Sequence, residues 1–122
     1  MHVKDLLLVG LGGAIGSVMR YAAGILAKPL GAFPLNTWIV NLAGSFLIGW
    51  IASSFMQDQK LHGALGLFLI TGICGGFTTF SAFSWEGLQL LQQQRIAIYL
   101  IYVISSLLGG LLFVWLGMKM SR

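Results

Sequence analysis

The sequence predicts an all-α membrane protein with four transmembrane helices, and three observations lead to this fold class. Only 8% of the 122 residues are charged, against about 25% in soluble domains. Hydrophobic residues make up 57% of the chain, and the mean hydropathy is +0.90. The charged residues also divide the chain into four long apolar stretches. Seven basic and three acidic side chains are too few to solvate a soluble domain, which argues against a water-soluble enzyme.

The apolar stretches predict membrane spans at about residues 4–27, 34–56, 62–92 and 96–119. Each is longer than the ~20 residues that an α-helix needs to cross the hydrocarbon core of a bilayer. The connections at residues 28–31, 57–60 and 92–95 are short and carry turn-forming or polar residues. The chain is therefore expected to form a single transmembrane domain over residues 1–122.

The first span carries a pair of small residues and one charge. Gly12 and Gly16 are four residues apart, a spacing that lets two helices approach closely in lipid. Arg20 lies well inside the span. One interpretation is that its side chain reaches back to the membrane surface. The other is that it faces inward and provides a fixed positive charge at the entrance of an anion pathway.

The second span has a polar face. Thr37, Asn41 and Ser45 are spaced by four residues and therefore lie on one side of a helix. A carboxamide in the membrane interior must face protein or water. The stripe either joins this helix to a neighbour through hydrogen bonds or lines a hydrophilic pathway.

The third span is expected to be a broken helix. The pair Gly75-Gly76 weakens a helix by roughly 1 kcal/mol per glycine, and the β-branched pair Thr78-Thr79 weakens it further. We expect the break near residues 75–79, at the middle of the bilayer. The carbonyl groups that a break releases must meet water, protein donors or a cation, because lipid cannot satisfy them.

Two phenylalanines follow the expected break. Phe80 and Phe83 share a face if the helix resumes after it. The edge of a phenyl ring is electropositive, so an anion can approach it edge-on. Without further information, contact with lipid or with other helices is the more common role of such rings.

The fourth span repeats the polar spacing, and the basic residues give little orientation. Tyr102 and Ser106 are four residues apart, and Gly110 occupies the next turn. Four spans place Lys4, Lys60, Lys119 and Arg122 on one side and Arg20, Lys28 and Arg95 on the other. Since this asymmetry is weak, the chain either inserts in both directions and forms an antiparallel homodimer or has one ordinary topology.

The sequence contains no recognisable catalytic or metal-ligating side-chain pattern. There is one cysteine, Cys74, and there are two histidines, too few for a zinc site. The acids Asp5, Asp58 and Glu86 are not paired with a nucleophile. The basic residues are scattered at span ends, which fits membrane anchoring and argues against nucleic-acid binding.

Three sequence stretches resemble the signatures of the Fluc (CrcB) family of fluoride channels. They are GGAIGSVMRY at residues 12–21, NLAGSF at 41–46 and GGFTTFS at 75–81. The resemblance extends over the whole chain, and the third stretch is the most specific. It implies a passive, fluoride-selective channel that exports fluoride across the cell (inner or plasma) membrane. It also implies an antiparallel, dual-topology homodimer with two pores.

The resemblance further assigns expected roles to individual residues. Fluoride would pass along the ring edges of Phe80 and Phe83, assisted by the amide of Asn41. The hydroxyl track would be formed by Thr79, Ser81, Tyr102 and Ser106, and Arg20 would lie at the aqueous vestibule. A structural sodium ion at the dimer centre would be held by the carbonyl oxygens of Gly75 and Thr78. Thr37, on the polar stripe of the second span, is added to the expected fluoride pathway.

Two departures from the family pattern and two alternatives accompany this interpretation. Ala82 stands where the family usually has a hydroxyl residue, and Gly110 stands where some members have serine. One alternative is a small proton-coupled multidrug exporter, but this class needs an acid deep in the first span, where only Asp5 is present at the edge. The other is a non-transporting subunit of an assembly.

Overall fold

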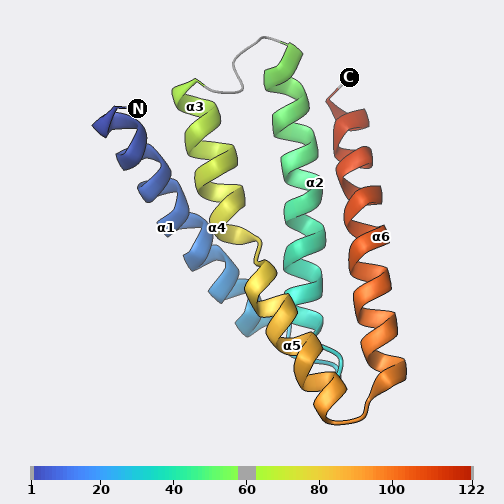
Figure 1. The fold of residues 1–122 in the computed structure, drawn as a ribbon. Helices are drawn as coiled ribbons and strands as arrows, with labels where there is room; N and C mark the ends of the chain where they lie inside the picture. The colour runs from blue at the N-terminus through green and yellow to red at the C-terminus, as the bar shows by residue number, and fades with distance from the viewer. Residues whose placement is uncertain (1, 58–62, 122) are drawn as a thin grey trace.

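The computed structural model describes residues 2–57 and 63–121, and every described helix belongs to one of four apolar spans (Figure 1). These spans are α1 (Val3–Leu26), α2 (Leu35–Gln57), the composite third span (Ala64–Gln92) and α6 (Ile96–Met120). Each is long and apolar enough to cross a membrane, so the prediction of an all-α, four-span protein is confirmed. Most of the predicted connection at 57–60 lies outside the described residues. The predicted start of the third span at 62 also lies outside them.

The third span consists of four segments with different backbone geometry. They are α3 (Ala64–Gly66), the π-helix η1 (Leu67–Cys74), α4 (Gly75–Phe77) and α5 (Phe80–Gln92). Between α4 and α5 the backbone is extended at Thr78 (φ −86°, ψ 156°) and at Thr79 (φ −150°, ψ 119°). We call these two residues the interruption. The π-helix had no counterpart in the sequence-based prediction.

The glycine pair lies before the interruption. Gly75 is helical, with φ −64° and ψ −37°, and α4 continues through Phe77. The backbone leaves the helix at the two threonines, where the N–H of Thr79 is paired with a side chain of α2. Gly76 serves a different purpose, since a Cβ on it would meet the main chain of Gly13 in α1.

The helices form two closely packed pairs. α1 packs mainly along η1 and α4, and α2 packs along α6. Both ends of the described chain lie at the same end of the bundle, at the top of Figure 1, while α5 and the start of α6 form the opposite end. At the turn after α1, Gly31 has φ +61°, a left-handed conformation that glycine adopts without steric cost.

Glycines bring α1 into backbone contact with the third span. A Cβ on Gly12 would collide with the carbonyl oxygen of Phe68 and with Cα of Gly72. A Cβ on Gly16 would collide with the main chain of Ile73 and Phe77. The close helix approach expected from the spacing of Gly12 and Gly16 is therefore present, and the structure shows that its partner is the third span. It brings Arg20, one turn after Gly16, alongside α4.

We predict that Gly12→Ala lowers the stability of the folded protein by about 1–3 kcal/mol, because the added methyl group forces α1 away from η1. Gly10→Ala is the matched control, since a Cβ on Gly10 meets no described atom within 4 Å. Unfolding of both variants in detergent measures the difference. Equal losses of stability would contradict the close contact.

Candidate ion site at the interruption of the third span

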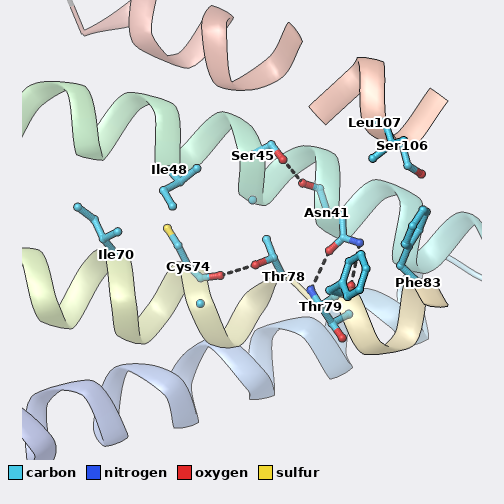
Figure 2. A pocket seen from close by; sticks show the side chains of 13 residues that line it. Asn41, Ser45, Ile48, Ile70, Cys74, Thr78, Thr79, Phe83, Ser106 and Leu107 are labelled. Carbon is cyan, nitrogen blue, oxygen red and sulfur yellow. Dashed lines mark hydrogen bonds between the residues drawn. The ribbon is translucent and has the colours of Figure 1, made fainter. Parts of the chain in front are cut away.

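The extended residues of the interruption are paired with a side chain of α2. Nδ2 of Asn41 donates to the carbonyl oxygen of Thr79 at 3.1 Å, and the N–H of Thr79 donates to Oδ1 of Asn41 at 2.9 Å (Figure 2). The carboxamide thus binds both polar groups of one residue, as a neighbouring strand would. Main-chain groups inside a membrane require such partners.

The helix ends on both sides of the interruption are also capped by side chains. Nε of Arg20 donates to the carbonyl oxygen of Gly76 at 3.1 Å. Oγ1 of Thr78 donates to the carbonyl oxygen of Cys74 at 3.0 Å. Oγ1 of Thr79 accepts from the N–H of Ala82 at 3.2 Å and thereby caps the N-terminus of α5. The Arg20 contact is the inward-facing arrangement, rather than one in which the side chain reaches to the membrane surface.

Carbonyl groups on the N-terminal side of the interruption and within it lose their usual helical donors. The N–H of Thr79, which would bond Gly75 in a continuous α-helix, donates to Asn41 instead. Among the residues that the structure describes, no donor reaches the carbonyl oxygen of Thr78. Oxygen atoms of this kind are suitable ligands for a hard cation.

The two expected phenylalanines are neighbours at the start of α5. The ring centroids of Phe80 and Phe83 are 5.9 Å apart, with planes inclined by 40°. Phe80 is 78% exposed in the single chain. Phe83 also contacts the ring of Tyr102 at a centroid distance of 5.1 Å. The ring of Phe83 is therefore half-buried against α6, whereas the ring of Phe80 is exposed on the surface of the single chain.

The side chain of Tyr102 is fully buried in the single chain, whereas a pore-lining side chain would be exposed to the pore. Its exposed fraction is 0%, and its ring is held between Phe83 and Phe33, the latter edge-on at 5.5 Å. Its hydroxyl group donates to Oε1 of Glu86 at 3.4 Å. Sequence analysis did not identify Phe33, because it stands in a connection outside the predicted spans.

A cavity of about 330 Å³ borders the interruption on the side of α2 and α6, and we call it the aromatic cavity (Figure 2). Most of the residues expected to contact ions line this cavity. These are Asn41, Gly75, Thr78, Thr79, Phe80, Phe83 and Ser106, together with Ser45. The two expected cation ligands therefore share one cavity with five of the expected fluoride contacts.

A second cavity of about 520 Å³ lies between α1, α2 and α5, and we call it the arginine cavity. Its polar lining includes Arg20, Thr37 and Glu86. Asn36 also lines it, and within the described residues its Oδ1 is buried without a hydrogen-bond partner. Sequence analysis did not select Asn36, which lies outside the four-residue spacing of the polar stripe.

Among the described residues, Thr79 is the one that lines both the aromatic cavity and the arginine cavity. Of the remaining expected residues, Ser81 is exposed at the first turn of α5, with its Oγ 3.2 Å from Oγ1 of Thr79. Ser81 and Tyr102 line neither of these two cavities. The fold thus gathers the expected residues around the interruption, with Tyr102 behind the aromatic pair.

A family model and individual relatives of this chain point to the same protein family. The family described as "CrcB-like protein, Camphor Resistance (CrcB)" matches residues 7–118. A protein of Rhizobium meliloti (strain 1021) is 43% identical over 122 residues, which cover 98% of both chains. A protein of Thermus thermophilus is 46% identical over 123 residues, covering 99% of this chain and 96% of the relative. Both relatives carry the name "Fluoride-specific ion channel FluC".

Proposed function

Since the chain belongs to the Fluc (CrcB) family, we propose that it is a fluoride-selective ion channel and not an enzyme. Fluoride would leave the cytoplasm passively, down its electrochemical gradient. The protein is a multi-pass membrane protein, and we assign it to the cell (inner or plasma) membrane. The names of its relatives and the arrangement of residues at the interruption both support this function.

The observation that carries the proposal is the aromatic pair beside a cavity into whose mostly apolar lining a few hydroxyl and amide residues are set. Fluoride is small and strongly hydrated, so a pore must replace its water with closely spaced favourable contacts. The edges of Phe80 and Phe83 offer positive density, and Thr79 and Ser106 offer hydroxyl groups in the same cavity. A narrow passage between phenyl rings would exclude the larger chloride ion. Ser81, next to Thr79, would extend the hydroxyl track.

The arginine cavity is suited to be the aqueous vestibule. Arg20 places a positive charge on its wall, and Thr37 adds a hydroxyl group. Nε of Arg20 is already bonded to Gly76, so the charge is fixed in position and cannot follow the ion. A fixed positive charge raises the local concentration of anions at such an entrance.

We further propose that the channel is an antiparallel, dual-topology homodimer with two pores. The basic residues are divided almost evenly between the two sides of the four-span arrangement, which permits both orientations. Phe80 is 78% exposed at the edge of the aromatic cavity. A second copy would cover that ring and complete each pore, and would place the interruption at the middle of the bilayer. Tyr102 would then contribute from behind Phe83.

A structural sodium ion at the dimer centre would be held by the carbonyl oxygens of Gly75 and Thr78. Both residues line the aromatic cavity. The N–H of Thr79 is turned toward Asn41 and not toward Gly75. Neutral carbonyl oxygens at an interrupted helix are suitable for a monovalent cation. The bound ion would join the two copies and would not be transported.

The alternative of a proton-coupled multidrug exporter lacks its essential residue. Such a mechanism requires an acid deep in the first span that exchanges protons for a cationic substrate. Asp5 is the only acid in α1, and it lies in the first turn. Its Oδ2 accepts from the N–H of His2 at 3.3 Å and so serves as part of a helix cap.

We predict that the purified protein in liposomes releases fluoride electrogenically along a fluoride gradient and excludes chloride. A fluoride electrode records the release, and a potassium ionophore provides the compensating charge movement. Empty liposomes are the control for leak. Verified insertion of folded protein without fluoride flux would refute the channel.

We predict that Phe80→Ile and Phe83→Ile each reduce fluoride flux by about tenfold or more, because the branched side chain has no electropositive ring edge. Phe113→Ile is the matched control, since Phe113 lines neither cavity. Flux and the elution volume of the folded protein are compared for all three. Unchanged flux in both pore variants would assign the rings to packing only.

We predict that sodium raises the thermal unfolding temperature of the wild-type protein relative to an equal concentration of N-methyl-D-glucamine. An ion that binds only the folded state stabilises it by an amount that grows with the logarithm of its concentration. Potassium at the same concentration tests size selectivity. A response to ionic strength alone, equal for all three cations, would contradict a sodium site.

A further inference from the structure

The carboxamide of Asn41 is bonded through both its oxygen and its nitrogen to the main chain of Thr79. Its Oδ1 and Nδ2 each form a hydrogen bond to that residue, at 2.9 and 3.1 Å. The orientation of the amide is fixed by these partners, because a flipped amide would place oxygen against oxygen and nitrogen against nitrogen. An ion that required Nδ2 in the same direction would have to displace the carbonyl group of Thr79.

Thr79 occupies a position from which a small displacement has large effects. It lines both the aromatic and the arginine cavities, and it is the only residue shared between them in the described chain. Its hydroxyl group caps α5 through the N–H of Ala82. Phe80 follows it directly as the first residue of α5. A shift of Thr79 would therefore change the boundary between the two cavities, and it would also move the N-terminus of α5, which carries Phe80 and Phe83.

We propose that Asn41 is a positioning residue, which controls fluoride passage by holding the Thr79 peptide in place rather than by binding the ion with its amide. This inference rests on the proposed channel function. It changes the expected role of Asn41, whose amide was assigned directly to fluoride by family resemblance. The amide belongs to α2, which is a continuous helix. Its two hydrogen bonds fix the peptide of Thr79 relative to α2, within the only two non-helical residues described in the third span.

The two roles of Asn41 make different predictions for the N–H of Thr79. If the amide holds the peptide, removal of the amide exposes this N–H to water from the cavities on either side. If the amide binds only the ion, the N–H keeps its environment. The roles also differ in their dependence on fluoride concentration. If Asn41 binds fluoride, its loss lowers the affinity for fluoride, and a high fluoride concentration restores the flux. If Asn41 holds Thr79, its loss displaces the Thr79 peptide and lowers the flux at every fluoride concentration.

The experiment uses full-length protein with ¹⁵N-labelled threonine, in which amide hydrogen exchange of Thr79 is followed by NMR. In Asn41→Ala we expect exchange at Thr79 to accelerate about tenfold, in proportion to the loss of one hydrogen bond. We expect fluoride flux in liposomes to fall by at least the same factor, equally at low and at saturating fluoride. Exchange at Thr71, which is exposed on η1, should not change.

Asn41→Asp and Asn36→Ala complete the test. The aspartate keeps an acceptor for the N–H of Thr79 but cannot donate to its carbonyl oxygen, so exchange at Thr79 should stay slower than in Asn41→Ala. It also serves if the alanine variant does not fold. Asn36→Ala removes an amide from the same helix that has no bond to Thr79, and it should leave exchange at Thr79 unchanged.

Three results would overturn the proposal. They are unchanged exchange of Thr79 in Asn41→Ala, accelerated exchange with normal flux, and a loss of flux that high fluoride restores. A wild-type protein without any fluoride flux would instead refute the channel function. The exchange measurements would still decide whether Asn41 holds Thr79, so the two failures are distinguishable.

Discussion

The need to pair every main-chain polar group inside the membrane governs the third span. A continuous helix meets this need internally, whereas an extended residue does not. Here the interruption is made possible by side chains of other helices. Asn41 binds the peptide of Thr79, and Arg20 binds the carbonyl group of Gly76. The polar residues of the first and second spans thus have a structural role before they have any role toward an ion.

The glycine contacts of α1 are what make the Arg20 hydrogen bond geometrically possible. Gly12 and Gly16 allow the backbone of α1 to touch that of η1 and α4. Van der Waals contact of this kind replaces the hydrophobic effect as the force between helices in lipid. A guanidinium group one turn beyond Gly16 therefore reaches Gly76 at the end of α4. Close packing and capping are two parts of the same arrangement.

Sequence analysis could predict the spans because length and hydropathy alone determine them. It could also select Thr78-Thr79, because β-branched residues weaken a helix, and the polar stripe of α2, because an amide is costly in lipid. It attributed part of the weakness of the helix to Gly75-Gly76, which in fact remain helical, and of the two Gly76 gives room to α1. Hydrogen bonds between residues 38 positions apart, such as that of Asn41 to Thr79, depend on tertiary packing and leave no local pattern. For the same reason the π-helix, Phe33 and the depth of Tyr102 were not foreseen.

The two extended residues also have a consequence for the rotational phase of the third span. In an unbroken α-helix each residue turns the chain by a constant angle, so faces can be extrapolated from one end to the other. The extended dihedral angles of Thr78 and Thr79 cancel that relation. The faces of α5 consequently cannot be extrapolated from those of η1 with the helical period. Tolerance to substitution along this segment should show two separate helical periodicities, with a new origin at Phe80.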